Sequence, residues 1–405
     1  MGRPGVDRRD HDLRHFHHLA PADLARLFER APASFTRSGD RDTLAVALGA
    51  TLYMPATRPA LADDLARRSA AGVMSSVLCL EDAIGDADQA AAGRNVTTQL
   101  RRFAEDLGAG PAAEARGPLV FVRIRHPEQI PAVVAGLGDA VHVLSGFVLP
   151  KFTDTNGAAF LDALTDTADA CGQRLFAMPV LESREVAHRE TREETLVGVA
   201  QLLAKHRDAV LAVRIGATDL CSAFGIRRSR DLTIYDVHPV AEVIAAVVNV
   251  LGRADGTGHV VTGPVWEYFH DRERLFKPQL RQSPFDAHDA LALRRQLITR
   301  DLDGLIREIV LDRANGLTGK TVIHPTHVAA VHALSVVTHE EFSDAMDVRH
   351  TEATGGGATP SRYGNKMNEA RPHLAWAERT LARAEVFGVA AEGVTEVDLL
   401  AASVV

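Results

Sequence analysis

The sequence predicts a closed (β/α)8 barrel with an extension at each end. Short apolar runs alternate with longer segments of helical periodicity over residues 46–330, and there are eight such repeats, the number that closes a barrel of parallel strands. Charged residues follow nearly every run, as expected where the carboxyl ends of barrel strands supply reactive groups. No Gly-x-Gly-x-x-Gly turn follows the first run, which disfavours the competing open doubly wound sheet.

The predicted strands are rich in Val, Ile, Leu and Phe, as strands buried on both faces are. They are residues 50–55, 76–80, 119–124, 145–150, 175–181, 210–215, 259–262 and 320–324. The segments between them repeat apolar residues every three or four positions, the spacing of an amphipathic helix. The helices expected on this basis are residues 59–69, 130–137, 158–170, 193–205, 239–251 and 291–314.

The segments outside the eight repeats are an N-terminal arm, residues 1–45, and a C-terminal extension, residues 331–405. The arm holds four clustered histidines, His11, His15, His17 and His18. We expect a solvated helix there rather than a metal site, because no acid or cysteine lies at ligand spacing. The extension has a predicted flexible link over residues 355–361 and a predicted helix over 372–386. It is expected to dock at the barrel mouth or on a neighbouring subunit.

The composition limits the classes of function. The 405 residues include 45 Lys and Arg and 53 Asp and Glu, which gives a net charge of −8, and no long basic run occurs. A nucleic-acid partner is therefore not expected. The three cysteines show no Cys-x-x-Cys spacing, and no stretch approaches the roughly 18 apolar residues that a membrane span needs. We expect a soluble cytoplasmic protein without a membrane partner.

Charged residues at the ends of the predicted strands are the candidate functional groups. In strand order they are Arg58, Glu81 with Asp82, Arg123 with Arg125, Lys151, Glu182, Asp219 and His324. Glu182 and Asp219 end successive strands and are 37 residues apart (219 − 182), the length of one strand–helix–strand repeat. Parallel neighbours bring both carboxylates to one edge of the sheet, where two oxygen ligands can share a divalent cation such as Mg²⁺.

This combination of residues suits one kind of chemistry. Arg123 can bind a substrate carboxylate through its two-pronged guanidinium. A divalent ion chelated by an α-keto acid accepts negative charge on the keto oxygen when a carbon–carbon bond breaks, which gives a metal-bound enolate without a Schiff-base lysine. Glu81 and Asp82 are expected to orient water bound to the metal.

Each assignment has an alternative. The two candidate metal ligands can instead belong to a buried ion network with Arg214 or Lys151. Arg123 can form a salt bridge to Glu81 or Asp82 instead of binding substrate. Lys151 can act as a Schiff-base nucleophile, although the neighbouring acids disfavour that role.

Two long loops are predicted at the mouth, residues 221–236 and 264–284, where long loops often close over substrate. The first carries three arginines, Arg227, Arg228 and Arg230. These arginines either contact a phosphate or nucleotide group or remain solvated. The second carries three aromatic residues, Trp266, Tyr268 and Phe269. We expect the aromatic residues to pack within a lid rather than to stack on a ligand. His324, which precedes Pro325, is either a helix cap or a catalytic residue.

Seven motifs resemble, in order and spacing, the HpcH/HpaI aldolase and citrate lyase β-subunit superfamily. They are residues 52–56, 78–84, 122–124, 149–151, 181–183, 216–219 and 319–325. The resemblance implies a (β/α)8 TIM barrel in a homotrimer or homohexamer, with Mg²⁺ on Glu182 and Asp219. It also implies that Arg123 binds the oxo-acid carboxylate and that Glu81 and Asp82 contact the metal waters.

The same resemblance implies small-molecule substrates, because several members of the superfamily act on CoA thioesters. Further substrate-binding positions are expected in or beside the matched motifs. They are Arg58, Lys151, Gly216, Ala217 and Thr218.

Four further sequence segments resemble a branch of C–C bond lyase-like barrels associated with bacterial tellurium-resistance and stress gene clusters. They are residues 214–220, 233–236, 263–269 and 365–369. In CoA-dependent relatives, a C-terminal segment with Lys-Met and an acid donates a catalytic acid to the site of the adjacent subunit. Lys366 and Met367 with Glu369 are the candidate counterpart here, and a plain helix N-terminus is the alternative.

The sequence therefore predicts a Mg²⁺-dependent carbon–carbon lyase or aldolase. Its expected substrate is an oxo-acid or hydroxy-acid, either free or as an acyl-CoA thioester. One alternative is a metal-enolate enzyme of another reaction class, such as isomerisation or phosphotransfer. The other is a barrel that serves as a non-catalytic subunit.

Overall fold

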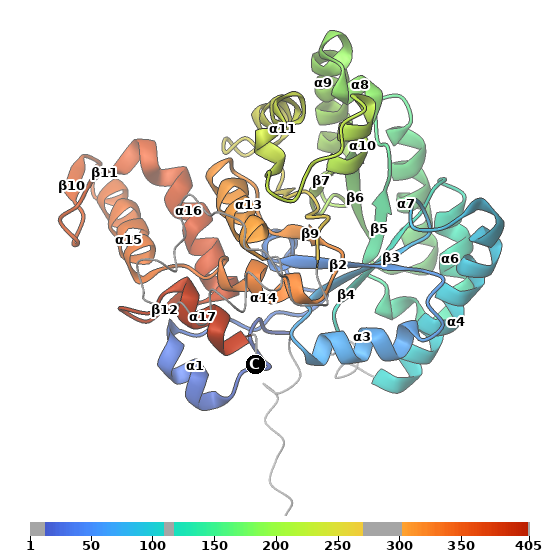
Figure 1. Ribbon diagram of the computed structural model, residues 1–405, viewed down its shortest axis with the longest axis horizontal. Coiled ribbons are helices and arrows are strands. Elements are labelled where there is room, and N and C mark those ends of the chain that lie inside the picture. The colour runs from blue at the N-terminus through green and yellow to red at the C-terminus, as the bar shows by residue number, and fades with distance from the viewer. Residues whose placement is uncertain (1–12, 109–116, 270–301, 404–405) are drawn as a thin grey trace, which may run out of the picture.

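The computed structural model describes residues 13–108, 117–269 and 302–403. At its centre eight parallel strands are arranged in the order β8-β7-β6-β5-β4-β3-β2-β9 (Figure 1). The strands are β2 (Ala50–Pro55), β3 (Ser75–Cys79), β4 (Leu119–Arg123), β5 (Gly146–Leu149), β6 (Phe176–Leu181), β7 (Val213–Ile215), β8 (Val261–Thr262) and β9 (Lys320–Val322). The predicted (β/α)8 fold is confirmed.

The first and last strands of this order, β8 and β9, meet and close the barrel. The Gly263 N–H donates to the Gly319 carbonyl at 3.1 Å, and the Thr321 N–H donates to the Gly263 carbonyl at 3.0 Å. Neighbouring strands are in parallel register, as where Tyr53 lies opposite Val77. Since all eight strands run in the same direction, their carboxyl ends form one mouth.

The strand bounds differ most from the predicted ones at β7 and β8. The predicted strand 210–215 begins later, at β7, because Val210 forms an isolated bridge with Ala177 before the regular ladder starts. The next predicted strand is also shorter, because the His259 N–H donates to the Leu251 carbonyl at 2.7 Å, at the end of the preceding helix, instead of to a strand. Single backbone bonds still join these residues to neighbouring strands, as where the Leu211 N–H donates to the Ala177 carbonyl at 3.0 Å and the Val213 N–H donates to the Val260 carbonyl at 2.8 Å.

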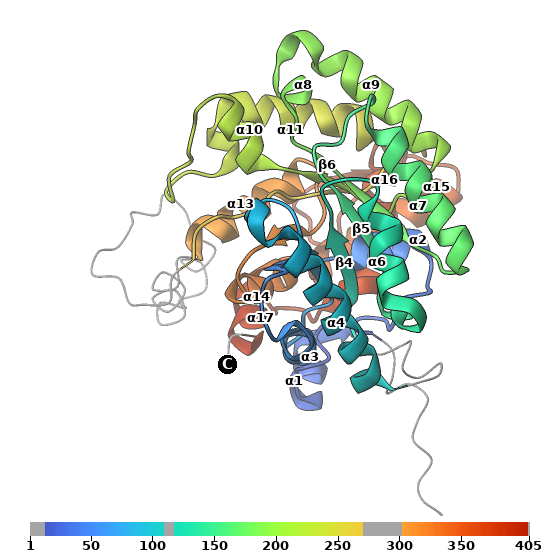
Figure 2. The ribbon, with the colours of Figure 1, turned by 90° about the vertical axis from the view of Figure 1, so that its right-hand side faces the viewer.

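Helices cover the outside of the barrel (Figure 2). They are α3 (Leu61–Ala70), α4 (Gln89–Leu107), α6 (Gln129–Leu137), α7 (Gly157–Cys171), α8 (Arg184–Ala187), α9 (Arg189–Lys205), α10 (Ala217–Ala223), α11 (His238–Leu251) and α13 (Asp303–Ala314), with 3₁₀ turns η2 (Asp86–Asp88), η3 (Gly138–Val143) and η4 (Ile234–Asp236). Each longer helix buries one face, as α4 does with Val96, Leu100 and Phe103. The predicted helix 291–314 is confirmed over α13, and its first part lies outside the described residues.

The N-terminal arm is not the solvated helix that its histidines suggest. The chain around His15 forms turns, and His15 is fully buried. Its Nε2 lies 3.0 Å from the Ala47 carbonyl, and its ring centre lies 4.2 Å from that of Phe387 and 4.6 Å from that of His332. Burial lowers the pKa of His15 to about 3, so the neutral imidazole packs there as a flat ring with one hydrogen bond.

The remaining arm residues form short elements. They are α1 (Pro21–Leu27), β1 (Phe28–Arg30) and α2 (Arg41–Ala47). His17 and His18 are exposed, and His11 lies outside the described residues.

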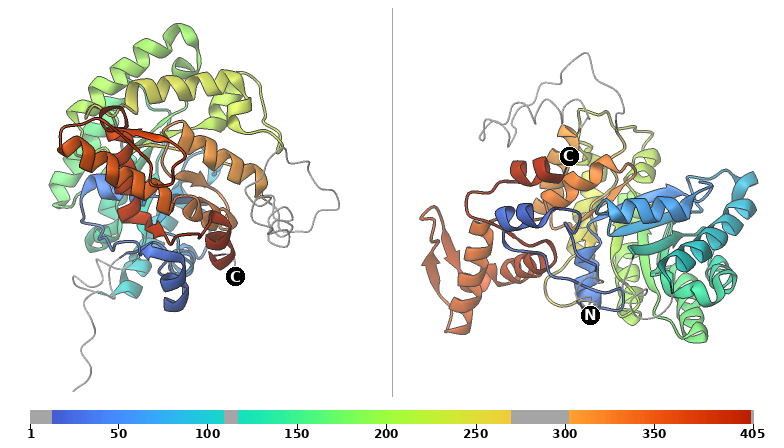
Figure 3. Two further views of the ribbon diagram at one scale, coloured as in Figure 1. Left: turned by 90° about the vertical axis from the view of Figure 1, so that its left-hand side faces the viewer. Right: turned by 90° about the horizontal axis from the view of Figure 1, so that it is seen from below.

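The C-terminal extension packs on the barrel and on the arm of the same chain. Its elements are α14 (Thr326–Ala333), α15 (His339–Ala353), β10 (Ala358–Pro360), β11 (Met367–Glu369), α16 (Ala370–Phe387), β12 (Val389–Ala390) and α17 (Glu396–Ser403). β12 pairs antiparallel with β1, with Phe28 opposite Ala390, and α16 contacts α2. The predicted flexible link 355–361 is wrong in part, because Ala358–Pro360 forms strand β10 of the β10–β11 hairpin, which lies at the edge of the molecule (Figures 1 and 3). No described helix is long and apolar enough to cross a membrane.

Candidate active site at the barrel mouth

Six charged side chains meet at the mouth, each placed by the end of a strand or by the turn that follows it. This mouth cluster consists of Glu81, Asp82, Arg123, Lys151, Glu182 and Asp219. The strands that carry these residues, β3 to β7, are consecutive neighbours in the barrel, so residues far apart in the sequence come within ion-pair distance. The structure thus brings together the predicted metal ligands, the predicted carboxylate-binding arginine and the acids expected to orient water.

Arg123 is at the centre of the mouth cluster. Its Nη2 lies 2.8 Å from Glu182 Oε1, 2.9 Å from Glu81 Oε2 and 3.1 Å from Asp82 Oδ2. The salt bridge to the acid pair, which the sequence offered as an alternative role, is therefore present. Its Nε is also buried and has no hydrogen-bond partner among the described residues. The guanidinium therefore keeps one donor that the described protein groups do not use.

Lys151 lies beside this arginine, in the turn after β5. Its φ of 48° is in the left-handed region, which is uncommon for a residue with a side chain. In this conformation its N–H donates to Glu182 Oε1 at 3.0 Å, while its Nζ lies 2.7 Å from Glu81 and 3.9 Å from Asp219. Burial lowers the pKa of Lys151, but the hydrogen bond and the charge of Glu81 outweigh it and the pKa is raised. A Schiff-base nucleophile needs a neutral amine, so this geometry disfavours that alternative.

Glu182 is the most deeply buried acid of the mouth cluster, with 2% of its side chain exposed. Its carboxylate fits because residue 216 is glycine: a Cβ on Gly216 would lie 2.0 Å from Glu182 Oε2. Burial raises the pKa of Glu182 to about 7; Arg123 opposes this change and Asp219 adds to it. Even with an arginine in contact, the site holds too little positive charge to keep this carboxylate fully ionised at neutral pH.

Asp219 lies in the first turn of α10, directly after β7. Its side chain is 32% exposed, so it is more open to solvent than Glu182. Thr218 donates from Oγ1 to Glu267 Oε1 at 3.2 Å, and Ala217 is buried. These residues and Gly216 shape the turn that carries Asp219, and their contact with substrate stays a prediction.

The mouth cluster contains more acid than base. Four carboxylates face two cations, so its net charge is −2 when every group is ionised. Within the described ranges, no three His, Cys, Asp or Glu side chains are grouped so as to hold a metal ion by themselves. Mg²⁺ needs only one or two protein carboxylates, because substrate oxygens and waters complete its coordination. The excess of acid and the raised pKa of Glu182 therefore fit a divalent cation held by Glu182 and Asp219.

A sequence-family model described as C–C bond lyase of the TIM-barrel fold matches residues 42–389. The chain belongs to this family. The match begins within α2 and ends at β12. The unit that C–C bond lyases of this family share therefore includes the barrel and most of the predicted C-terminal extension.

Two solved structures show the same fold as this chain. CitE from Mycobacterium tuberculosis, in complex with magnesium, acetoacetate and coenzyme A, is 20% identical, with a TM-score of 0.51 over 84% of this chain and 99% of that one. A citrate lyase from Burkholderia xenovorans LB400 is 18% identical, with a TM-score of 0.58 over 87% of this chain and 96% of that one. No curated protein sequence matches the chain.

Two of the predicted charged site residues lie outside the mouth cluster. Arg58 donates from Nε to Asp64 Oδ2 at 2.6 Å, in the first turn of α3. Glu369 is exposed on β11, in the hairpin at the edge of the molecule (Figure 1). No described contact joins either residue to the mouth cluster, so a catalytic role for Glu369 requires the mouth of a second copy of the chain.

Arg228 corrects the prediction made for the first long loop. It is neither solvated nor available to a phosphate, because 1% of its side chain is exposed and it forms an ion pair with Glu308. Its guanidinium carbon lies 4.9 Å from the ring centre of Trp266, which is also buried, so this aromatic residue packs as the sequence predicts. The other two arginines of the loop, Arg227 and Arg230, are exposed.

His324 follows β9 and precedes α14. The Thr326 N–H lies 3.4 Å from its Nδ1, and the Thr326 Oγ1 lies 2.7 Å from the same atom. Its ring stacks on that of Phe269, with ring centres 4.6 Å apart. The N-cap of α14 is Pro325, so His324 lies just before the start of the helix and its side chain contacts the first helical residue; a catalytic role for His324 stays untested.

The sequence alternatives misplaced Arg214, and they did not include Tyr53, which lies near Arg214 in the barrel. Arg214 does not pair with the acids at the mouth, as one alternative held, but points into the barrel interior toward Thr51 and Thr321. A signal for this placement was present, because Arg214 is a single charge within the apolar run 210–215. In a strand whose two faces are both buried, such a side chain cannot reach solvent and has to find its partners inside the protein.

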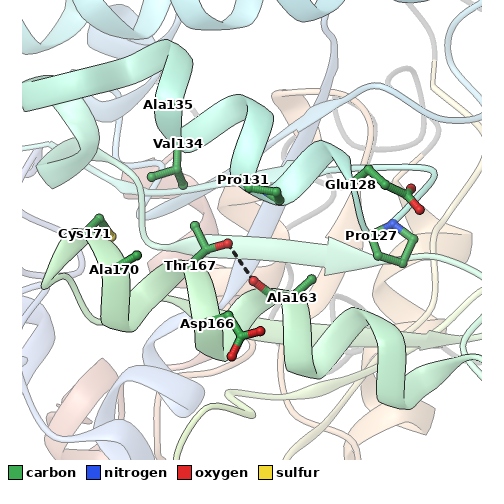
Figure 4. Close-up of a pocket in the computed structure, with 10 residues that line it drawn as sticks. All are labelled: Pro127, Glu128, Pro131, Val134, Ala135, Ala163, Asp166, Thr167, Ala170 and Cys171. Carbon is green, nitrogen blue, oxygen red and sulfur yellow. Dashed lines mark hydrogen bonds between the residues drawn. The ribbon is translucent and has the colours of Figure 1, made fainter.

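A separate groove lies on the outside of the barrel between α6 and α7 (Figure 4). Its lining is mostly apolar and includes Pro131, Val134 and Ala163, with Glu128 and Asp166 as its two acids. The groove contains no member of the mouth cluster. It therefore adds no group to the chemistry at the strand ends.

Proposed function

We propose that the protein is a Mg²⁺-dependent carbon–carbon lyase or aldolase that acts on an oxo-acid or hydroxy-acid through an enolate. The observation that carries this proposal is the acid excess of the mouth cluster, in which Glu182 and Asp219 end adjacent strands. Membership of the C–C bond lyase family supports the reaction class. The magnesium, acetoacetate and coenzyme A in the complex of CitE, which has the same fold, support the choice of metal and of substrates, including acyl-CoA thioesters.

The proposed roles follow from the contacts in the mouth cluster. Glu182 and Asp219 would hold the ion, and Mg²⁺ when bound supplies a Lewis acid for the keto oxygen of the substrate. Arg123 would orient the substrate carboxylate. Lys151 would add a fixed positive charge where negative charge develops. Glu81 holds both cations in place, because its two carboxylate oxygens contact one cation each.

The metal site is tested by isothermal titration calorimetry with Mg²⁺. Glu182→Gln and Asp219→Asn should each abolish Mg²⁺ binding and the cleavage of any substrate found in a panel of oxaloacetate and acyl-CoA thioesters. Asp86→Asn is the matched control, because Asp86 is an acid with 93% of its side chain exposed and lies outside the mouth cluster. Turnover that persists unchanged in metal-free buffer contradicts the proposal.

The reaction class is tested by incubating the protein with Mg²⁺ and oxaloacetate or pyruvate in deuterated water. A lyase fragments or condenses its substrate, whereas a metal-enolate enzyme of another class exchanges protons without fragmentation. Mass spectrometry of the recovered acid separates these outcomes. A purely scaffolding barrel is not favoured, because a scaffold has no use for four acids that converge at one mouth.

A further inference from the structure

Arg214 lies inside the barrel, two residues before the glycine that makes room for Glu182. It belongs to β7 and is 1% exposed. Its Nη1 donates to Thr51 Oγ1 on β2 at 3.3 Å, and its Nη2 donates to Thr321 Oγ1 on β9 at 2.6 Å. Neither β2 nor β9 is adjacent to β7 in the barrel. The side chain therefore crosses the barrel interior from one wall to another.

The Arg214 guanidinium has no carboxylate partner in the described part of the chain. The groups whose charge acts on it are Tyr53 and Arg123, and its Nε has no hydrogen-bond partner. A buried cation without an opposite charge is costly, so an arginine with a purely structural role is expected to have an acid beside it. Arg228, which is also fully buried, meets this expectation through its ion pair with Glu308. Arg214 does not.

Tyr53 lies between this arginine and the mouth cluster. It follows Thr51 by two residues on β2, so both side chains point into the barrel. The Arg214 guanidinium carbon lies 5.4 Å from the centre of the Tyr53 ring. Arg123 and Glu182, both members of the mouth cluster, also act on the charge of the phenol. Tyr53 is partly exposed although it points into the barrel, so its accessible part faces the mouth.

We propose that Tyr53 is a further catalytic residue: its hydroxyl donates a hydrogen bond to the substrate oxygen that gains negative charge, and Arg214 is a positioning residue that holds the phenol from below. This inference rests on the proposed function, which supplies the oxo-acid substrate. Burial raises the pKa of Tyr53, with Arg214 and Arg123 opposing it, so the phenol keeps its proton at neutral pH. Two neighbouring guanidiniums polarise the O–H and strengthen its hydrogen bond to an anionic oxygen.

The competing explanation is that Tyr53 and Arg214 only fill and brace the barrel interior. Both explanations predict that removal of the Arg214 charge changes the stability of the fold. They differ in ligand binding, because a bracing residue leaves the affinity of a folded variant unchanged. A hydrogen-bond donor to substrate sets the affinity for an anion that resembles the enolate.

The test uses the full-length protein with Mg²⁺ and oxalate, a planar dianion that resembles the enolate of an oxo-acid. Calorimetry gives the Mg²⁺ affinity first and then the oxalate affinity in saturating Mg²⁺. The variants are Tyr53→Phe, Arg214→Met, Arg214→Lys and the double variant of Tyr53→Phe with Arg214→Met. Tyr363→Phe is the matched control, since it removes the same hydroxyl from an exposed tyrosine. Thermal melting shows that each variant is folded.

We expect Tyr53→Phe to weaken oxalate binding roughly 10–100-fold, the effect of one hydrogen bond to a charged group, while Mg²⁺ affinity stays unchanged. Tyr363→Phe should bind oxalate as the wild type does. Arg214→Met should produce a similar loss, and Arg214→Lys should restore part of the affinity. The double variant should bind no more weakly than Tyr53→Phe, because Arg214 acts through the phenol.

Wild-type oxalate affinity in Tyr53→Phe overturns the inference, while Mg²⁺ binding through Glu182 and Asp219 would still stand. If the wild type takes up no Mg²⁺, the proposed function fails, and oxalate binding in metal-free buffer then decides the inference. If oxalate binding then depends on Tyr53, the inference stands. If oxalate does not bind, or binds equally well to Tyr53→Phe, the inference is overturned. If Arg214→Met does not fold, the comparison of Arg214→Lys with the wild type takes its place.

Discussion

The mouth cluster and a second group of charges, beside α13, use the same residue types in different ways. This second group, the α13 network, consists of Arg228, Glu308, Asp312 and Lys320. At most 4% of any of its side chains is exposed. Its two cations match its two buried acids, and the partly exposed Glu267 lies 3.8 Å from Arg228 at its edge, whereas the mouth cluster has two acids in excess. Two members of the mouth cluster, Asp82 and Lys151, are about half exposed.

Every carboxylate oxygen in the α13 network has a donor. The Lys320 ammonium lies 2.9 Å from Glu308 Oε1 and 2.6 Å from Asp312 Oδ2. The other Glu308 oxygen accepts from Arg228 and from the Ile234 N–H at 2.7 Å. The other Asp312 oxygen accepts from the Tyr235 hydroxyl at 2.9 Å. The carboxylates of this network are therefore paired without a ligand, although Arg228 Nε has no partner among the described residues, and the network fastens α13 and the loop before α11 to β9.

The carboxylates of the mouth cluster are less fully paired. Arg123 shares one nitrogen among three acids. Burial raises the pKa of Glu182 to about 7, and that of Asp312 in the α13 network to about 6. The comparison therefore separates charges that stabilise the fold, in the α13 network, from charges that are available to bind a cation and a substrate, in the mouth cluster. The balance of buried charge and the pairing of the carboxylate oxygens, rather than residue type, distinguish the two groups.

The largest expected effect is on the α13 network. Glu308→Gln removes one partner of two buried cations, so we expect the free energy of unfolding to fall by about 3–5 kcal/mol in urea titrations. Mg²⁺ affinity should be unchanged in the folded fraction. Asp86→Asn, in an exposed ion pair, should change stability by less than about 1 kcal/mol. A loss as small as this for Glu308→Gln would break the comparison.

Mg²⁺ should stabilise the wild type through the mouth cluster. At about 100 times its dissociation constant, a ligand that binds only the folded state adds roughly 2.7 kcal/mol to the free energy of unfolding. Thermal melting with and without Mg²⁺ measures this gain. Glu182→Gln should remove the gain without weakening the metal-free protein. A gain that survives in Glu182→Gln would place the ion elsewhere.

The pH dependence of stability should differ between the wild type and Glu182→Gln. The folded protein keeps a proton on Glu182 up to about pH 7, while the unfolded chain releases it near pH 4.5, so without metal this group makes the wild type less stable as pH rises between these values. This difference in pKa between the folded and unfolded states corresponds to roughly 3 kcal/mol, which Glu182→Gln lacks. Denaturation in urea at a series of pH values measures the difference.

Two buried histidines act in the opposite direction on this pH dependence. Burial lowers the pKa of His15 and that of His327 to about 3. Below pH 6.5 the unfolded chain therefore binds protons that the folded chain does not, and both the wild type and Glu182→Gln lose stability. Their effect cancels when the variant is compared with the wild type. Parallel pH curves for the two proteins would argue against an uncompensated acid at the mouth.

The smallest expected effect comes from Gly216→Ala. The added methyl group meets the Glu182 carboxylate, so we expect a loss of roughly 1–3 kcal/mol and a lower Mg²⁺ affinity by calorimetry. Gly93→Ala is the matched control, since nothing lies within 4 Å of the added carbon in the middle of α4. It should raise stability by roughly 0.5–1 kcal/mol. Equal outcomes for the two substitutions would mean that Glu182 is not packed against Gly216.

Local pattern was enough to predict the barrel and the composition of its mouth. Each strand is an apolar run that ends at a charged residue, and the repeat length alone places Glu182 and Asp219 at the ends of adjacent strands. Neither inference needs a partner from a distant part of the chain. The positions of the eight strands are therefore confirmed to within a few residues, except at the starts of β7 and β8.

The predictions that failed depend on partners supplied from far along the chain. Arg228 is buried because Glu308, 80 residues later, meets it. His15 is buried because His332 and Phe387, both in the C-terminal extension, cover it. Sequence spacing carries no information about such distant contacts.

The pairing of β1 with β12 has a consequence for biosynthesis. Residues 28–30 leave the ribosome early, but their strand partner at 389–390 follows only after the barrel, α15 and α16 have been made. Until then the aromatic surface around His15 has no cover from Phe387. The arm must therefore wait, undocked, through most of translation, and chaperones or proteases would encounter it during that interval.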